Sequence, residues 1–405
     1  MADYGKMERQ LREAVDSGVV PGVIAIAVNA DERLYENAIG RRGLSTTEPM
    51  TLDSVLFYAS MTKALVGAAA MQLVEQGRAD LDEPISRFLP TLAKPKVLEG
   101  YDAAGRTIIR PAKRQITLRH LLTHTSGFGY DIWNANVCRY MAENGIPGVC
   151  DSRLITLDVP LVADPGERWE YGIGIDWVGR FVEAASGQDL EGYLHDHLFE
   201  PLGMQDTGFI LNTDRRQRLA ELHQRDPDGT LHPIDQMMTQ TPEFYMGGAG
   251  LYGTAGDYAV FIQMMLNEGR SREGLQVLKP ETVALMGENS IGELQAGALK
   301  SVIPAASYDI DFFPGMDQKW GLSFLINTED APAGRSADSL SWAGVINSYY
   351  WIDRKKKLGG VLMTQILPFA DPIVLKLYDE FERATYGVES ALCRAEERAD
   401  TSAMQ

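Results

Sequence analysis

The sequence predicts an α+β fold in which an antiparallel sheet, flanked by helices, is built from both ends of the chain, with a mainly helical lobe inserted between them. Strand-like apolar runs stand near both termini, whereas the middle shows helical periodicity and long connections. The 405 residues also exceed the ~100–200 that are usual for one domain. We predict a sheet lobe formed by 1–80 and 315–405, and a helical lobe formed by 81–314.

The N-terminal part of the sheet lobe is predicted to be a helix followed by a hairpin. Apolar residues repeat at helical spacing over 6–18. The apolar run 23–28 predicts a buried strand, and the turn at 29–31 pairs it with a second strand over 33–39. These elements place the first two strands of the sheet near the N-terminus.

The C-terminal part is predicted to be a second hairpin and a helix. Two apolar runs, 345–352 and 358–366, flank the basic turn 353–357. Residues 371–386 carry an apolar stripe at helical spacing, and 388–405 lose this periodicity. We therefore expect two more strands, an amphipathic helix and a loose tail.

Composition and charge exclude several classes of protein. Hydrophobic residues make up 45% and charged residues 23% of the chain, which is typical of a globular protein. A formal net charge of −18 argues against binding to nucleic acids and to anionic membranes. The N-terminus shows no secretory signal pattern, and no run approaches the ~20 apolar residues of a membrane span. We expect a cytoplasmic protein.

The three cysteines are Cys138, Cys150 and Cys393, and none of them belongs to a C-x-x-C pair. An odd number at wide spacing predicts free thiols in a reducing compartment. A bridge between Cys138 and Cys150 stays open.

The sharpest local pattern is Ser60-Met61-Thr62-Lys63, at the start of an apolar helical stretch that ends at Gly77. Two residues three apart lie on one face of a helix. A serine hydroxyl is a weak nucleophile until a base removes its proton, and a lysine in a desolvated pocket has a lowered pKa and can be that base. The alternative is an N-cap serine with a solvent-facing lysine.

Two further segments carry candidate site residues. Tyr171 follows a Pro-Gly turn and precedes a helix, so its phenol can project into a cleft and shuttle a proton beside a lysine. Residues 340–345 open a predicted strand, where a backbone N–H could pair with that of Ser60 around an oxyanion. A packing tyrosine and an ordinary strand entrance are the alternatives.

Together these segments resemble the serine β-lactamase and penicillin-binding-protein superfamily, and most closely its ester-cleaving branch, the family VIII carboxylesterases. Three more stretches support the resemblance: 116–130, 199–204 and 247–254. Residues 97–102 and 171–177 also resemble the fungal acyltransferases that complete statin synthesis. The resemblance implies a β-lactamase/transpeptidase-like fold, with the active site in the cleft between the two lobes.

The resemblance also implies a role for each candidate residue. Ser60 would be the acylated nucleophile, Lys63 would help to deprotonate it, and Tyr171 would be general base and then acid toward the leaving alcohol. The backbone N–H groups of Ser60 and Val345 would form the oxyanion hole. The implied substrate-binding residues are Tyr130, Ile173, Asp176, Trp342 and Gly344. No cofactor and no metal is implied.

Two departures from the superfamily bear on the substrate. Ile173 replaces the asparagine of Tyr-x-Asn, and Trp342 replaces the lysine of Lys-Thr-Gly. The missing groups would hold the amide and the carboxylate of a β-lactam. We therefore predict a serine hydrolase (EC 3.1.1) whose partner is a small, neutral, short-chain ester.

Several alternatives to this prediction stay open. They are an acyltransferase that uses an alcohol acceptor, a β-lactamase or D-amino-acid peptidase, and a receptor acylated only once. The sequence also leaves open a homo-oligomer, and whether Lys63 or Tyr171 takes the first proton.

Other catalytic and metal-site patterns are less well supported. His120 and His124 stand four apart without the glutamate of H-E-x-x-H, and His195 and His197 lack a clear third ligand, so we expect structural histidines. G-x-S-x-G is absent. The glycines of 247–256 lack the lysine of a P-loop, and they predict a loop beside the cleft that leads into a helix capped at Thr254 or Asp257.

Overall fold

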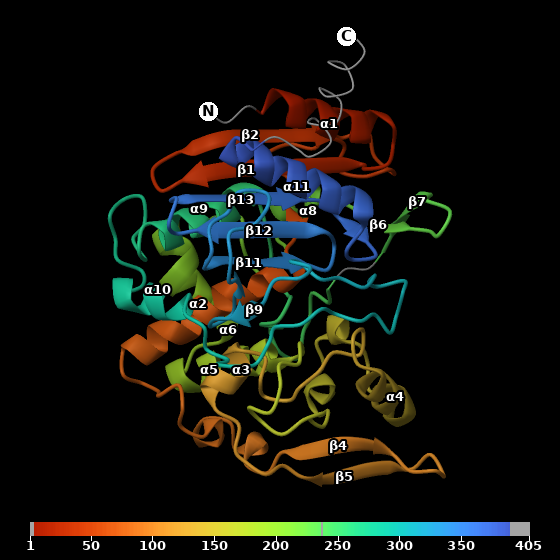
Figure 1. Ribbon diagram of the computed structural model, residues 1–405, viewed down its shortest axis with the longest axis vertical. Coiled ribbons are helices and arrows are strands. Elements are labelled where there is room, and N and C mark those ends of the chain that lie inside the picture. The colour runs from red at the N-terminus through yellow and green to blue at the C-terminus, as the bar shows by residue number, and fades with distance from the viewer. Residues whose placement is uncertain (1–3, 236–237, 389–405) are drawn as a thin grey trace, which may run out of the picture.

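The computed structural model describes residues 4–235 and 238–388. Its main sheet has seven strands, and every neighbouring pair is antiparallel (Figure 1). In spatial order the strands are β2 (Arg33–Gly40), β1 (Gly22–Asn29), β13 (Leu358–Met363), β12 (Ser348–Asp353), β11 (Ser339–Gly344), β10 (Leu325–Asn327) and β9 (Gln318–Trp320). The predicted fold class is confirmed: an antiparallel sheet joins the two ends of the chain.

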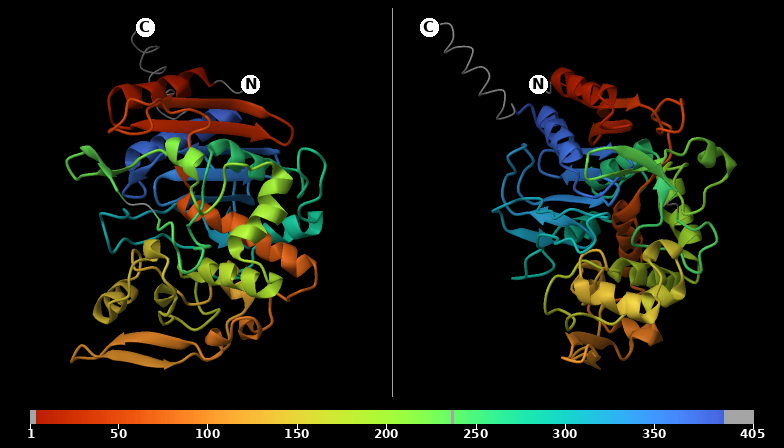
Figure 2. Two further views of the ribbon diagram at one scale, coloured as in Figure 1. Left: turned by 180° about the vertical axis from the view of Figure 1, so that it is seen from behind. Right: turned by 90° about the vertical axis from the view of Figure 1, so that its right-hand side faces the viewer.

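Helices cover both faces of this sheet. Trp351 of β12 packs on Tyr378 and Phe381 of α11 (Pro372–Tyr386), whereas its neighbour Tyr350 packs on Tyr258 of α9 (Ala255–Leu266). Successive strand residues point to opposite faces, so α11 and α9 lie on opposite sides (Figure 2). The central strands are consequently apolar on both faces, which explains the continuous run in β1.

Helix α1 (Gly5–Asp16) packs beside α11 and against β2, so the two ends of the chain close one face together (Figure 1). The predicted helices at 6–18 and 371–386 are confirmed, as is the first hairpin. Residues 389–405, where the loose tail was predicted, lie outside the described residues.

Helix α2 (Thr62–Glu75) is the buried centre of the remaining part, where it packs on α5 (Gly174–Ser186). The other helices are α3 (Leu118–Leu122), α4 (Ala135–Asn144), α6 (Leu190–Leu194), α7 (Glu200–Leu202), α8 (Thr213–Gln217) and α10 (Pro280–Met286). A π-helical turn, η6 (His195–Phe199), joins α6 to α7. The 3₁₀ turns are η1 (Ala59–Met61), η2 (Ile85–Arg87), η3 (Pro90–Leu92), η4 (Val149–Asp151) and η5 (Leu154–Leu157).

Three small sheets complete the described fold. They are β3 (Leu56–Phe57) with β8 (Tyr252–Gly253), the hairpin of β4 (Lys96–Tyr101) and β5 (Thr107–Pro111), and β14 (Ile366–Leu367) with β6 (Leu222–Arg225) and β7 (Leu231–Ile234). The predicted lobe boundaries remain a prediction. Helix α9, which lies within the predicted helical lobe, packs against β1, β12 and β13 of the main sheet.

The second hairpin was predicted at 345–352 and 358–366, whereas its strands are Ser348–Asp353 and Leu358–Met363. Residues 340–344 belong to β11, residues 345–347 form a turn, and the next strand begins only at Ser348. Asn347 has a φ of +58° and donates its side-chain amide to the carbonyls of Ile366 and Pro368, so the chain reverses here. Segment 340–345 therefore does not open the strand that was predicted to continue to 352; its residues 340–344 form most of the preceding strand β11.

The basic residues 354–357 form the turn between β12 and β13, as predicted. Cys138 is a free cysteine, so a bridge to Cys150 is not formed. Within the described ranges, no helix combines the length and the apolar character needed to cross a bilayer.

Candidate active site

Ser60 lies in the short turn η1, between β3 and α2. Ala59 just before it has a φ of +47°, an uncommon backbone conformation for a residue with a side chain. Two buried tyrosines hold the turn: Tyr58 donates its hydroxyl to the carbonyl of Thr254, and Tyr258 donates to that of Met61. The nucleophile candidate thus stands on a strained, fixed turn, where the residue is 9% exposed.

Lys63 follows three residues later on α2 and is completely buried. Its Nζ lies 3.0 Å from Ser60 Oγ, 3.1 Å from the hydroxyl of Tyr130 and 2.6 Å from the carbonyl oxygen of Gly248. Burial lowers the pKa of this amine to about 7, although the charge of Asp176 opposes the shift. Near neutral pH the amine is therefore partly unprotonated and within reach of the serine proton.

Tyr171 reaches the same place from the loop before α5. Its hydroxyl accepts a hydrogen bond of 2.9 Å from the indole Nε1 of Trp342, and Lys63 Nζ lies 4.9 Å from the centre of its ring. Burial raises the pKa of the phenol, while hydrogen bonding to Ser60 and Trp342 opposes the rise. The phenol therefore stays protonated at neutral pH and can act as a proton donor.

The loop around Gly248 closes the site from behind Lys63. Its N–H donates to Asp176 Oδ1 at 2.9 Å, while its carbonyl accepts from Lys63. A Cβ at this position would lie 2.6 Å from Asp176 Oδ2 and 2.9 Å from the hydroxyl of Tyr130, so any larger residue would displace one of these two side chains. Lysine and aspartate are thus joined through the backbone of one residue, Gly248.

Asp176 is 1% exposed, and Oδ2 has no hydrogen-bond partner among the described residues. Burial raises the pKa of this carboxyl to about 6, although the Lys63 charge and the Gly248 N–H oppose the rise. The substrate-binding role of Asp176 remains a prediction. Its contacts favour a part in holding the Gly248 loop.

The end of β11 lies against the nucleophile turn. A Cβ on Gly344 would be 2.6 Å from the carbonyl oxygen of Tyr58 and 3.4 Å from Ala59 Cβ. Val345 begins the following turn and is half-buried. This approach supports an oxyanion hole formed by the N–H groups of Ser60 and Val345, which remains a prediction.

Aromatic rings form the wall beside Tyr171. Trp342 packs on Tyr171, Trp320 and Phe312, with centroid distances of 4.9, 4.7 and 5.3 Å. Trp133 packs on both Tyr130 and Tyr171. Ile173 is buried at the N-terminus of α5. The structure thus brings Ser60, Lys63, Tyr130, Tyr171 and Trp342 together.

Sequence reasoning missed several of these contributions. It placed Tyr130 on a substrate wall, whereas the structure shows its hydroxyl on Lys63. It described the glycine loop only as lying beside the cleft, although the helix cap at Thr254 is confirmed. The roles of Gly248, Trp133 and Phe312 depend on contacts between distant segments, which no local pattern signals.

The histidines at 120 and 124 take part in local structure. His120 Nδ1 accepts from the N–H of Thr117 in a capping box on α3. His124 is buried against Tyr171, with 4.7 Å between ring centroids, and burial lowers its pKa well below the usual value. Its carbonyl accepts from Glu170 N–H at 2.8 Å and so fixes the segment that leads to Tyr171.

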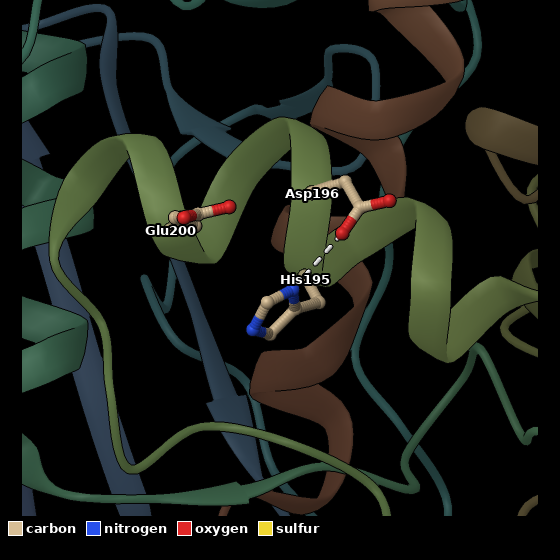
Figure 3. Close-up of side chains that lie close together, drawn as sticks. All are labelled: His195, Asp196 and Glu200. Atoms are coloured by element: carbon tan, nitrogen blue, oxygen red, sulfur yellow. Dashed lines mark hydrogen bonds and ion pairs between the residues drawn. The ribbon is translucent and has the colours of Figure 1, made fainter.

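Among the described residues, one group has side-chain atoms close enough for a metal ion: His195, Asp196 and Glu200 (Figure 3). Their candidate ligand atoms lie within 4.8 Å of one another, and His195 Nδ1 is 3.0 Å from Asp196 Oδ1. All three are exposed on one helical stretch, where acidic groups commonly gather without a metal.

Comparison with known proteins gives one family and several close relatives. The sequence profile of the family named Beta-lactamase matches residues 7–381. The chain is 34% identical to Monacolin J acid methylbutanoyltransferase of Aspergillus terreus, over 94% of this chain and 95% of that protein. It is 31% identical to Lovastatin esterase of Penicillium rubens, over 95% and 99% of the two chains.

A solved structure, unliganded simvastatin synthase (LovD) from Aspergillus terreus, superposes with a TM-score of 0.81. The match covers 94% of this chain and 97% of that one at 32% identity. One of the two sequence relatives is named for acyl transfer and the other for ester cleavage. The names of both relatives therefore describe chemistry on acyl esters.

Proposed function

Because this chain belongs to the Beta-lactamase family, we propose that it is a serine carboxylesterase that cleaves small neutral esters through an acyl-enzyme on Ser60. The observation that carries the proposal is the buried contact of 3.0 Å between Lys63 Nζ and Ser60 Oγ, with Tyr171 at the same place. A serine, an amine base and a phenol acid are sufficient for two-step acyl transfer.

In the first step, Lys63 takes the proton of Ser60 while Oγ attacks the ester carbonyl. The lowered pKa of Lys63 and the raised pKa of Tyr171 support the amine as the first base. The negative oxygen of the tetrahedral intermediate is held by the N–H groups of Ser60 and Val345. The intermediate collapses when Tyr171 protonates the leaving alcohol and receives the proton held by Lys63.

In the second step, water attacks the acyl-enzyme carbonyl and gives its proton to the same pair. The acid is then released, and the proton returns to Ser60. The step needs no group beyond those already named, so the same residues serve acylation and deacylation in turn.

The substrate class follows from what is missing beside Trp342. This position carries no amine, and the indole N–H is already used by Tyr171. An anionic substrate would therefore gain no ion pair here, and the net charge of −18 further disfavours it. Neutral esters are favoured over β-lactams.

The test is Ser60→Ala with p-nitrophenyl butyrate. We expect the rate to fall by several orders of magnitude, because the nucleophile is lost. Retention of more than about a hundredth of the wild-type rate would reject Ser60. As a control, a fluorophosphonate should add its mass to the wild-type chain and not to the variant, which should keep the wild-type circular dichroism spectrum.

Acyl transfer to an alcohol is a second candidate, favoured by the aromatic wall of Tyr130, Trp133 and Trp342. Apolar rings around an acyl-enzyme favour an apolar acceptor over water. Added cyclohexylmethanol should then give a new ester at the expense of free acid. Formation of free acid alone, at an unchanged rate, would leave hydrolysis as the function.

A further inference from the structure

A cavity of about 350 Å³ lies between α11 and the main sheet, next to Ser341 and Trp342 of β11. It is bounded by the loops 310–316 and 331–335 and by α11, and we call it the α11 cavity. Much of its wall is apolar, from Phe312, Phe313, Pro332, Trp342 and Leu375. Phe312 and Trp342 also belong to the aromatic wall of the candidate active site, whereas Ser60, Lys63 and Tyr171 do not line the cavity. This volume lies in the range of small-molecule pockets.

The charged groups around the α11 cavity largely neutralise one another. Arg335 donates to both carboxylate oxygens of Glu382, and Arg383 donates to Asp379 at 2.7 Å. The fifth charged group in the wall is Asp311, so the remaining charge is negative. The remaining negative charge would repel an anion, whereas it would not repel a neutral ligand.

One polar group in this wall lacks a partner. Ser341 on β11 is 4% exposed, and its Oγ has no hydrogen-bond partner among the described residues. A buried hydroxyl without a hydrogen bond costs free energy, so such groups are normally paired. Its neighbour of the same type two residues away, Ser339, donates its hydroxyl to the carbonyl of Ser336.

We propose that the α11 cavity is a second binding site, for a small apolar molecule with one hydroxyl group that pairs with Ser341 Oγ. The volume sets the size of the ligand, the rings set its apolar body, and the cancelled charges require it to be neutral. The unpaired serine hydroxyl sets its single polar group. Ser60 takes no part in this binding.

Cyclohexanol is the probe, and its dissociation constant is measured by ligand-observed NMR titration. Binding should be equal in the wild type and in Ser60→Ala. Ser341→Ala should weaken it about five- to tenfold, because one hydrogen bond is lost. Methylcyclohexane, which lacks the hydroxyl, should show the same weakened binding to both wild type and Ser341→Ala, and cyclohexanecarboxylate should bind more weakly than cyclohexanol.

Ser339→Ala is the matched control, since it lies on the same face of β11 outside the cavity wall. It should leave cyclohexanol binding unchanged. Ala333→Trp, which fills the cavity, should abolish binding while the circular dichroism spectrum stays that of the wild type. Ser341→Ala tests the same point without adding volume, if the larger side chain prevents folding.

Unchanged affinity in Ser341→Ala would overturn the proposal, as would binding that survives in folded Ala333→Trp. Competition between cyclohexanol and a covalent inhibitor of Ser60 would also overturn it, because the probe would then occupy the candidate active site.

Discussion

Two buried pairs of opposite charge lie on the two sides of this molecule, and they differ in one respect. Arg335 and Glu382, under α11, contact each other directly through two hydrogen bonds. Lys63 and Asp176, beside the nucleophile, are separated by the backbone of Gly248, whose carbonyl accepts from Lys63 and whose N–H donates to Asp176. The first pair is in direct contact, whereas the backbone of Gly248 lies between the two members of the second pair.

The separation decides how each cation titrates. Burial disfavours both charges, yet Glu382, together with Tyr378 and Tyr386, more than compensates and raises the pKa of Arg335. At Lys63 burial prevails over the more distant Asp176, and the pKa falls to about 7. A buried ion pair in contact stabilises a fixed charge, whereas an interposed backbone residue leaves an amine able to exchange a proton near neutral pH.

The largest expected effect comes from removing the amine of the separated pair. Lys63→Met should lower kcat/KM for p-nitrophenyl butyrate by about 10³-fold, because general-base catalysis is lost. Steady-state kinetics measure the loss, and the unfolding temperature checks that the variant is folded. Loss of activity by less than about tenfold would contradict the role of Lys63.

Breaking the contacting pair should affect stability instead of chemistry. Glu382→Leu leaves Arg335 buried without its partner and should cost about 3–5 kcal/mol of unfolding free energy. Urea denaturation measures the loss, and kcat per folded molecule should stay close to wild type. In the control, Arg335→Met combined with Glu382→Leu should recover most of the stability; a further loss would show that the pair itself is stabilising.

Asp176→Asn tests whether the charge of Asp176 influences the pKa of Lys63 across the backbone of Gly248. The aspartate charge raises the pKa of Lys63, so its removal should lower that pKa further. The acid limb of kcat/KM, where the amine becomes protonated, should then move to lower pH by about one unit. A purely structural role would reduce activity without moving this limb.

Asp131→Asn is the matched control for this shift, because Asp131 is another carboxyl near the site, half-buried, whose charge acts on Tyr130. The acid limb of the kcat/KM profile of Asp131→Asn should coincide with that of the wild type. An equal shift in both variants would assign the effect to the general charge of the region instead of to Asp176.

The smallest expected effect concerns the hydrogen bond to the phenol. Trp342→Phe removes the donor to Tyr171 and should reduce kcat about five- to tenfold, the value of one hydrogen bond. Trp320→Phe is the control, since its indole donates to the carbonyl of Leu122 in the same aromatic cluster. If both variants lose activity equally, packing and not the hydrogen bond is responsible.

The fold was predictable because its signals are local. Periodicity gave the helices α1 and α11 and the strands β1 and β2 almost to the residue. The turn before β12 was missed, since Asn347 is fixed there by the carbonyls of Ile366 and Pro368, about twenty residues away. A strand boundary set by such a contact leaves no trace in the apolar pattern.

Some residues of the candidate site were predictable from local sequence, and others were not. Ser60 and Lys63 are three residues apart on one helical turn, so the sequence places them on one face, and the structure decides for their contact over a solvent-facing lysine. The place of Tyr171 beside them rested on the family resemblance, because a packing tyrosine has the same local pattern. The contact between Tyr130 and Lys63 was predicted neither by the local sequence pattern nor by the family resemblance, which placed Tyr130 only on a substrate wall.

The sequence by itself determined the order of elements, the antiparallel sheet and the serine with its lysine, because periodicity and helical spacing act over a few residues. Only the tertiary structure decided what that lysine does. It buried the amine against the carbonyl of Gly248 and placed Asp176 against the N–H of the same residue. A pKa depends on desolvation and on the distance to other charges, and both are set by segments that meet only when the chain is folded.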